Sequence, residues 1–284
     1  MTDDGVLLET TELTKEFGGF RAVDGVDLQV RAGDIHALIG PNGAGKTTLF
    51  NLMTGFLAPT RGEIRFRGEV ISGFSPQRLA GMGLVRSFQI TAIFDSMSVI
   101  DNIRLALQRK LGVSLKFWRS RRILSQLDGR AMEILDLVGL AGLADEASGS
   151  LPYGRKRALE LATTLAMDPA LMLLDEPTQG MGHEDVDHVT RLIKEVAQGR
   201  TVLMVEHNMS VVSTISNTLS VLQGGRLIAS GSYADVSRDP AVISAYLGTS
   251  ARKSGALTWV VRLPWSCRTC TPGMANRMSC MAWT

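Results

Sequence analysis

A glycine-rich segment near the start of the chain carries the residue types that bind a phosphate group. Gly40 and Gly45 are separated by four residues and are followed directly by Lys46 and Thr47. Glycines let backbone N–H groups curve around a phosphate, a lysine can bridge the β- and γ-phosphates, and a threonine hydroxyl can ligate Mg²⁺. The spacing therefore predicts a loop that binds a nucleoside triphosphate. The residues of this loop are Gly40, Pro41, Asn42, Gly43, Ala44, Gly45, Lys46, Thr47 and Thr48.

A pair of adjacent carboxylates, Asp175 and Glu176, follows the apolar run 171–174. A buried strand that ends in aspartate can hold a magnesium ion and its water shell below the phosphates, so Asp175 is the predicted metal ligand. Side chains alternate along a strand, and Glu176 therefore points elsewhere and could polarise an attacking water. Together with the phosphate-binding loop, the pair indicates hydrolysis of bound ATP with Mg²⁺ as cofactor.

The elements that must position these residues follow from hydrophobic periodicity. Continuous apolar runs at 35–39, 171–174 and 202–205 indicate parallel strands covered on both faces, while residues 6–32 alternate as a pair of strands. Residues from about 92 to 148 repeat at helical spacing. The pattern predicts an α/β P-loop NTPase fold with a mainly parallel central sheet, an N-terminal antiparallel β subdomain and an α-helical subdomain. Further strands are expected at 62–72, 218–222 and 226–230, and further helices at 47–53 and after Pro152.

Composition limits where the protein works and what it binds. The chain has 284 residues and a formal net charge of +2, too small to favour nucleic-acid binding. It has no apolar run of about 18 residues, the length needed to cross a bilayer, and its acidic start lacks the core of a signal peptide. The three cysteines all lie in the last eighteen residues, which fits a reducing compartment. We expect a cytoplasmic protein that reaches a membrane only through partners.

Five ordered motifs over about residues 6–248 resemble the ABC ATPase family. Besides the loop and the carboxylate pair, Gln89 matches the Q-loop glutamine and His207 matches the switch histidine. Phe17 matches the aromatic residue on which the adenine stacks, and Gln89 and His207 would contact the nucleotide. The catalytic residues that the resemblance implies are Lys46, Gln89, Glu176 and His207. The ligands that it implies for Mg²⁺ are Thr47, Gln89 and Asp175.

The segment Leu151–Arg155 stands where the ABC ATPase family carries its signature motif, some twenty residues before the carboxylates. It lacks the usual serine and glutamine, but Gly154 and the helix after it still offer backbone donors to an anion. The resemblance implies that Tyr153 and Gly154 contact the nucleotide of the other cassette in a head-to-tail dimer. The segment Gln179–Gly182 occupies the D-loop and lacks the familiar aspartate. Both departures concern contacts between subunits, not hydrolysis.

The same segments, with Val205–Met209 and the long helical stretch 92–148, look like the branched-chain amino acid uptake (Liv-type) branch. This resemblance implies an importer with a second ABC ATPase subunit, in a homo- or heterodimer, and two transmembrane permease subunits. A periplasmic substrate-binding protein would act through the permease. The chain would then lie at the cytoplasmic face of the inner membrane of a bacterium, as a peripheral subunit.

Other readings stay open at this point. The urea and short-chain amide uptake branch is close, and a single cassette of this kind also serves export, for example of lipopolysaccharide. A soluble ABC ATPase of repair, translation or sulfur assembly is a rival without a transport role; the first two kinds usually carry paired cassettes or long coiled-coil insertions. The last alternative is a non-catalytic scaffold that depends on nucleotide, and the presence of Glu176 and His207 argues against it.

The sequence divides into an ABC ATPase domain over residues 1–250, with a helical subdomain at about 90–165, and an atypical tail over 251–284. The tail contains Cys267 and Cys270 but no histidine and no clear fourth ligand, so zinc binding is not favoured. A frame displaced by two bases could encode the opening of a second cassette over this stretch. We therefore hypothesise that the tail is disordered or is an out-of-frame reading into a neighbouring gene, which the DNA sequence would decide.

Overall fold

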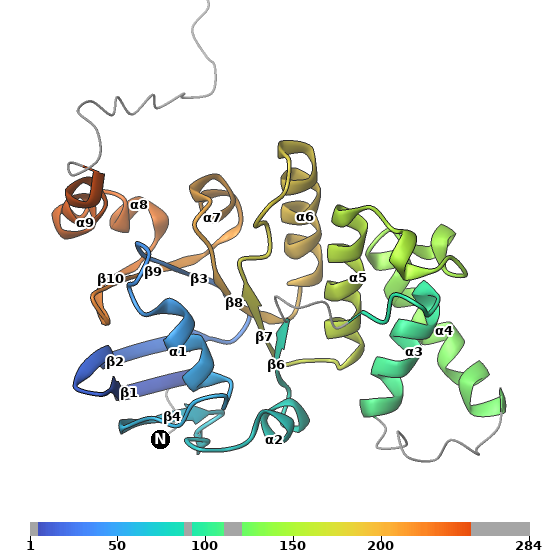
Figure 1. The fold of residues 1–284 in the computed structure, drawn as a ribbon, viewed down its shortest axis with the longest axis horizontal. Helices are drawn as coiled ribbons and strands as arrows, with labels where there is room; N and C mark the ends of the chain where they lie inside the picture. Colours follow the sequence, from blue (N-terminus) through green and yellow to red (C-terminus); the bar gives the residue numbers. More distant parts are fainter. Residues whose placement is uncertain (1–4, 88–92, 111–120, 251–284) are drawn as a thin grey trace, which may run out of the picture.

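The computed structural model describes residues 5–87, 93–110 and 121–250, which form two sheets and their flanking helices (Figure 1). The strands of the larger sheet are β3 (Ile35–Ile39), β6 (Leu84–Ser87), β7 (Leu171–Asp175), β8 (Thr201–Val205), β9 (Thr218–Gln223) and β10 (Arg226–Gly231). Their order is β10-β9-β3-β8-β7-β6, and all pairs are parallel except β10 with β9. The predicted mainly parallel sheet is confirmed.

The smaller sheet is antiparallel, as the sequence predicts for the N-terminal part. Its strands are β1 (Val6–Phe17), β2 (Phe20–Arg31), β4 (Arg61–Phe66) and β5 (Glu69–Val70), in the order β2-β1-β4-β5. The turn between β1 and β2 is Gly18-Gly19, both with positive φ, which permits a tight reversal of the chain. This sheet lies beside helix α1 (Lys46–Met53), which separates it from the larger sheet (Figure 1).

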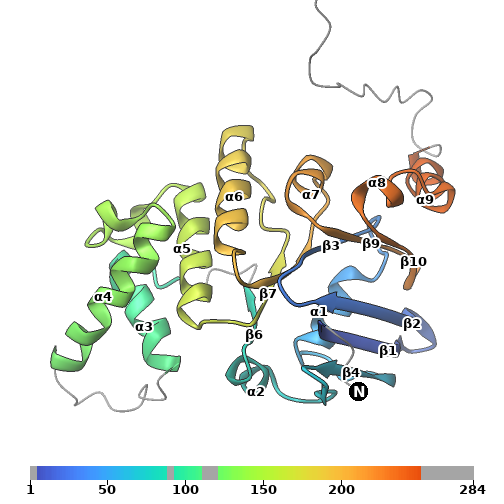
Figure 2. The ribbon, with the colours of Figure 1, turned by 180° about the vertical axis from the view of Figure 1, so that it is seen from behind.

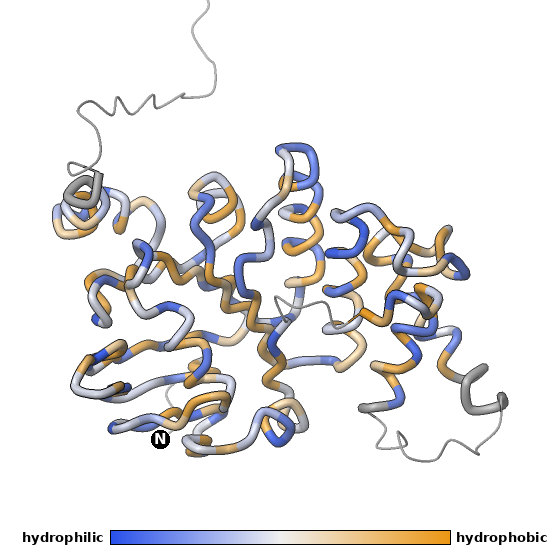
Figure 3. Tube along the Cα trace, in the orientation of Figure 1, coloured by the Kyte–Doolittle hydropathy of each residue, from blue (hydrophilic) through white to orange (hydrophobic). Residues whose placement is uncertain are grey.

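The central strands are buried along their whole length, because both faces of the larger sheet are covered. Alternation along β7 sends Leu171 and Leu173 to the core cluster that contains Phe50 of α1. Met172 and Leu174 point the opposite way, into the cluster formed with the helices on the other face. Figure 3 shows the hydrophobic character concentrated on these strands.

Helices cover the second face and extend the molecule to one side. They are α3 (Val99–Lys110), α4 (Arg121–Leu137), α5 (Tyr153–Ala166), α6 (His183–Val196), α7 (Met209–Ile215), α8 (Tyr233–Val236) and α9 (Pro240–Ser250), with 3-10 turns at Ala141–Leu143 and Ser148–Ser150. Helix α2 (Pro76–Gly81) differs, because its buried Leu79 belongs to the cluster on the α1 face. Figures 1 and 2 both place α3 and α4 beyond α5, away from β1 and β2. Within the residues that the structure describes, no helix is long and apolar enough to span a bilayer.

Strand β6 and helix α6 are among the elements near the nucleotide motifs that were not predicted from the sequence. Strand β6 has only two apolar residues, Leu84 and Val85, which is too short a run to stand out. Helix α6 begins with charged residues, and its buried side chains start only at Val189, so its apolar face is concentrated in the second half. The predictions for Gln89 and for the tail over 251–284 lie outside the described residues.

Candidate functional site

The predicted phosphate-binding loop lies between β3 and α1, at the carboxyl edge of the larger sheet. Gly45 has a φ of 101°, and a Cβ atom there would lie 2.2 Å from the carbonyl oxygen of Ala22. A Cβ atom at Gly40 would lie 2.2 Å from the carbonyl oxygen of Leu222. Only glycine fits such close approaches of backbone, so two neighbouring strands, β2 and β9, fix the path of the loop. The exposed residues of the loop are Asn42, Gly43 and Thr47.

Two elements from the C-terminal part of the chain hold the loop from behind. The backbone N–H of Gly225, in the turn between β9 and β10, donates to the carbonyl of Ala44 at 2.9 Å. The hydroxyl of Tyr246 in α9 takes a backbone hydrogen bond from Gly40, while burial raises the pKa of this tyrosine to about 12. The loop is therefore attached to the edge of the sheet and to the last described helix.

The ammonium of Lys46 is buried in the loop that precedes it. Its Nζ donates to the carbonyl oxygens of Gly40 at 2.6 Å and Pro41 at 3.1 Å. Burial lowers the pKa of Lys46, and the negative charges of Glu176 and Asp175 oppose this effect. The structure thus brings the predicted cation and both predicted carboxylates into one electrostatic neighbourhood.

Asp175 ends β7 with its side chain almost completely buried, at 3% exposure. One of its carboxylate oxygens accepts from the guanidinium of Arg86 at 2.5 Å. Arg86 comes from β6, the parallel neighbour of β7, and also donates to the side-chain oxygen of Asn51 in α1 at 2.6 Å. The predicted metal ligand is therefore charge-compensated by an arginine that the sequence analysis assigned no role.

Glu176 is half-buried and has a φ of 46°, an uncommon value for a residue with a side chain. Its N–H donates to the carbonyl of Val205 at 2.9 Å, and its own carbonyl accepts from Arg157 at 3.1 Å. Arg157 also donates to the carbonyl of Pro177 at 3.1 Å and forms an ion pair with Glu160. A backbone hydrogen bond to β8 and the side chain of Arg157 from α5 over-determine this turn, which is how a strained conformation persists.

His207 follows β8 at the same edge of the sheet and is exposed. The residue before it, Glu206, is fully buried and accepts from the backbone N–H groups of His207 and Asn208 at 3.0 and 3.2 Å. Its second oxygen accepts from the hydroxyl and the N–H of Thr178 at 2.6 and 3.1 Å. Glu206 therefore links the segment after Glu176 to the predicted switch histidine.

The other predicted residues of the nucleotide site are less tightly defined. Phe17 lies at the end of β1 with 46% of its surface exposed, and the ammonium of Lys15 is 5.2 Å from the centre of its ring. An exposed aromatic face of this kind is available for stacking. Gln89 lies outside the described residues.

The structure does not bring Tyr153 and Gly154 to the phosphate-binding loop of the same chain. They begin α5, which lies on the opposite side of β7 from α1 (Figure 1). The Tyr153 hydroxyl donates to the carbonyl of Gln179 at 3.2 Å. A Cβ atom at Gly154 would lie 2.7 Å from a carboxylate oxygen of Asp185 in α6. This region therefore packs against its own D-loop segment and α6.

Three residues with a clear part in this arrangement were missed by reasoning from the sequence: Arg86, Arg157 and Glu206. Each is charged, yet each lies in or beside a segment of apolar residues. A charge at the end of the run 202–205, or among the buried positions of α5, signals an internal partner. The identity of that partner depends on strand register and helix packing.

Comparison with known proteins agrees with this geometry. The family model described as ABC transporter matches residues 23–179, and one described as branched-chain amino acid ATP-binding cassette transporter matches residues 226–252. The chain is 38% identical over 252 residues to the high-affinity branched-chain amino acid transport ATP-binding protein BraF of Pseudomonas aeruginosa, covering 85% of this chain and 98% of that protein. It is also 38% identical over 249 residues to LivG of Escherichia coli, with the same coverage.

Among solved structures, the chain resembles an ATP-binding cassette of an ABC transporter in its ADP conformation. The TM-score is 0.74 and the sequence identity 30%, and the alignment covers 86% of this chain and 99% of that one. The described elements are thus arranged as in an ATP-binding cassette.

Proposed function

The chain belongs to the ATP-binding cassette family of ABC transporters and is an ATPase, and from this premise we propose that it powers uptake of branched-chain amino acids through separate permease subunits. The observation that carries the proposal is that the parallel strands β3 and β7 end at one edge of the larger sheet, where the loop with Lys46 follows β3 and Asp175 and Glu176 lie at the end of β7. A cation and two carboxylates placed behind a phosphate-binding loop are the groups that ATP hydrolysis requires.

The residues at this edge fit a magnesium nucleotide. The carboxylate of Asp175 and the hydroxyl of Thr47 are hard oxygen donors of the kind that Mg²⁺ prefers, and Gln89 would add an amide oxygen. When bound, Mg²⁺ would neutralise charge on the β- and γ-phosphate oxygens. Lys46 would turn from the loop carbonyls to the phosphates, and the loop N–H groups with the start of α1 would bind the β-phosphate.

We assign the hydrolytic step to Glu176 and His207. Glu176 would orient and polarise the water that attacks the γ-phosphate, and His207 would stabilise the charge that develops on the transferred group. Phe17 would stack on the adenine. The hydrogen bonds of Glu206 support the roles of Glu176 and His207, since they connect the backbone of His207 to Thr178 in the segment after Glu176.

Tyr153 and Gly154 would act on the nucleotide of a second ATPase subunit. Their position at the start of α5, apart from the loop of their own chain, supports a head-to-tail dimer in which each nucleotide lies between two cassettes. The γ-phosphate would gain contacts from both halves only when the dimer closes. Such a difference in affinity between open and closed states is what can drive a conformational change.

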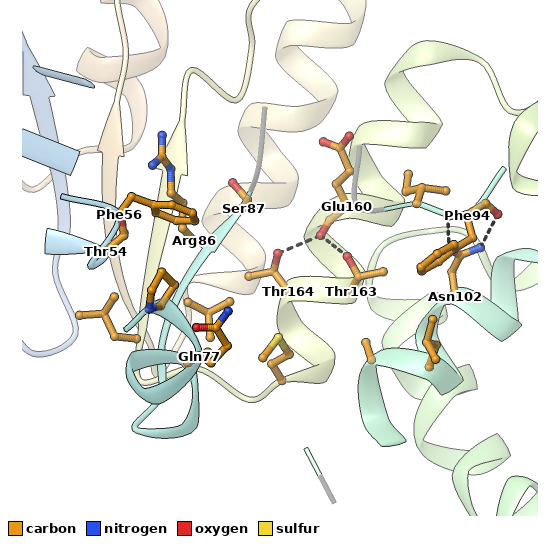
Figure 4. Close-up of a pocket in the computed structure, with 18 residues that line it drawn as sticks. Thr54, Phe56, Gln77, Arg86, Ser87, Phe94, Asn102, Glu160, Thr163 and Thr164 are labelled. Carbon is orange, nitrogen blue, oxygen red and sulfur yellow. Dashed lines mark hydrogen bonds between the residues drawn. The ribbon is translucent and has the colours of Figure 1, made fainter. Parts of the chain in front are cut away.

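A cavity beside helices α3 and α5 supports contact with a permease. It has a volume of about 760 Å³ and lies between α2, β6, α3 and α5 (Figure 4). Its wall combines apolar residues such as Phe56, Ile93 and Met167 with the carboxylate of Glu160. We place a cytoplasmic segment of one permease subunit here. The chain would then be a peripheral subunit at the cytoplasmic face of the membrane, with a periplasmic binding protein beyond the permease.

The assignment to branched-chain amino acids is supported by the names of the relatives and by the match over residues 226–252. Co-purification with permease chains tests the transport role, because a soluble ABC ATPase would bring none. Stimulation of ATP hydrolysis by leucine, isoleucine or valine in the reconstituted complex is the expected result. Stimulation by urea or a short-chain amide alone would contradict the assignment.

The catalytic assignment is tested by Glu176→Gln. The variant should bind ATP and form a stable dimer, yet hydrolyse ATP roughly 10²- to 10⁴-fold more slowly, because the carboxylate that activates water is gone. Glu195→Gln, an exposed carboxylate at the end of α6, is the control and should keep the normal rate. A normal rate in Glu176→Gln would contradict the assignment.

A further inference from the structure

Arg86 lies between the carboxylate of Asp175 and helix α1. It donates one hydrogen bond to Asp175 and a second to Asn51, at 2.5 and 2.6 Å. Its guanidinium carbon is 5.8 and 5.9 Å from the ring centres of Phe50 and Phe56. The arginine is thus fixed at both ends of its guanidinium and lies beside aromatic side chains.

The parallel pairing of β6 with β7 brings Arg86 to Asp175. Arg86 pairs with Leu173, and Asp175 lies two residues further on, on the same face of β7. Leu84 and Leu173 both belong to the core cluster under α1, so strand alternation directs the arginine and the aspartate toward α1. Figure 4 shows Arg86 beside Phe56 at the margin of the cavity.

This ion pair is buried, with side-chain exposures of 11% for Arg86 and 3% for Asp175. A buried carboxylate without a cationic partner is strongly unfavourable, and Arg86 supplies the compensation. The pairing is incomplete on the arginine side: among the described residues, Nε of Arg86 is buried and has no hydrogen-bond partner.

We propose that Arg86 is a positioning residue of the metal site, which holds and neutralises Asp175 and yields this carboxylate when a divalent cation binds with nucleotide. The inference rests on the proposed function, since it takes Asp175 as the ligand of Mg²⁺. A guanidinium and a divalent cation repel each other and compete for one carboxylate. Arg86 therefore lowers the affinity of the site for the metal.

The same charge has the opposite effect on nucleotide without metal. A nucleotide phosphate group is anionic, and in the absence of a divalent cation Asp175 repels it unless Arg86 compensates the carboxylate. Removal of the arginine charge should then strengthen metal binding and weaken metal-free nucleotide binding. A purely structural arginine would give a different result, because its loss would weaken both.

The test uses the full chain with Arg86→Met and the more polar Arg86→Gln, each checked for folding by circular dichroism. The affinity for Mn²⁺ is measured by electron paramagnetic resonance with saturating ADP, and the affinity for ADP in EDTA by fluorescence of a labelled ADP. We expect Mn²⁺ to bind roughly tenfold more tightly, the change that one opposed charge commonly produces. ADP in EDTA should bind about threefold more weakly or worse.

Two further variants sharpen the result. Arg86→Lys keeps the cation and should keep Mn²⁺ affinity near that of the wild type. Arg104→Met removes an arginine that pairs with Asp101 and Asp128 in α3 and α4, and should change neither affinity. Unchanged Mn²⁺ affinity in Arg86→Met and Arg86→Gln, or a parallel loss of both affinities, would overturn the inference alone. A wild-type chain that bound no ADP with or without metal would overturn the proposed function as well.

Discussion

Two regions are proposed to contact nucleotide: the loop between β3 and α1, and the start of α5. Different kinds of contact hold each region in place. Backbone atoms of β2 and β9 press against Gly40 and Gly45, so the loop has one available path. The start of α5 is held by side chains instead: Tyr153 bonds to Gln179 and Arg157 bonds to the carbonyls of the turn after β7. We call the loop the rigid half of the nucleotide site and the start of α5 its adjustable half. We expect the rigid half to bind phosphate without changing its backbone, and the adjustable half to shift when nucleotide binds.

Gly45→Ala should break the rigid half with the largest effect. The new Cβ atom would meet the carbonyl oxygen of Ala22 at 2.2 Å in a backbone conformation that alanine disfavours. We expect a loss of about 4 kcal/mol of stability, from strain and overpacking together, and loss of ATP binding. Urea unfolding and ATP titration measure both.

The matched substitution in the adjustable half is Gly154→Ala. The nearest atoms to its Cβ would be those of the Asp185 side chain, which is exposed and can move aside. We expect a change within about 1 kcal/mol, since alanine also favours the helix. Equal losses in Gly45→Ala and Gly154→Ala would contradict the distinction between the two regions.

Arg157→Ala tests the link between α5 and the turn that carries Glu176. The change removes two hydrogen bonds to backbone carbonyls and leaves Glu160 buried without its partner. We expect a loss of about 3 kcal/mol in the free energy of unfolding, as for other broken buried pairs. The double variant Arg157→Ala with Glu160→Gln should recover part of it. No difference between the single and double variants would show that the pair is not coupled.

Acid should weaken the sheet beneath the loop through His36. Burial lowers the pKa of this histidine in β3 to about 4, from an ordinary value of 6.5. The unfolded chain takes up a proton on this histidine as pH falls below 6.5, but the folded chain does so only at about 4. The free energy of unfolding is therefore fully present above pH 6.5 and falls between pH 6.5 and 4, by about 3 kcal/mol at most. Urea unfolding between pH 4 and 7 measures the slope.

His36→Gln should flatten that slope, because it removes the group that takes up the proton on unfolding. His188→Gln, in an exposed position of α6, is the control and should leave most of the slope in place. A slope that is the same in wild type and His36→Gln would show that other groups set the response to acid.

Tyr246→Phe tests the smallest contribution, the attachment of α9 to the loop. It removes the hydroxyl that takes a hydrogen bond from Gly40 and should lower stability by about 1 kcal/mol. Tyr233→Phe in α8 removes a hydroxyl elsewhere. If thermal unfolding showed no larger effect for Tyr246→Phe than for Tyr233→Phe, the attachment would carry no measurable energy.

Sequence patterns predicted the main elements, including the loop before α1 and the helix after Pro152 that became α5, better than the side-chain contacts between elements. The spacing of Gly40, Gly45 and Lys46 predicts a phosphate-binding loop, because it depends on local backbone chemistry alone. Apolar runs such as 171–174 indicate buried strands. The roles of Arg86 and Glu206 depend on which strands are neighbours and in which register, which periodicity does not contain. The short β6 and the polar beginning of α6 gave too little apolar pattern to be found. The role of Gln89 and the nature of the tail stay predictions.

Binding and hydrolysis of ATP by the purified chain, measured with Mg²⁺ for the wild type and Lys46→Ala side by side, test the central claim most directly. The wild type should bind ATP and release phosphate. The alanine variant should do neither, because it lacks the ammonium that would contact the phosphates at the edge of the sheet. A properly folded wild-type chain without affinity for Mg²⁺-ATP, or equal turnover by the two proteins, would contradict it.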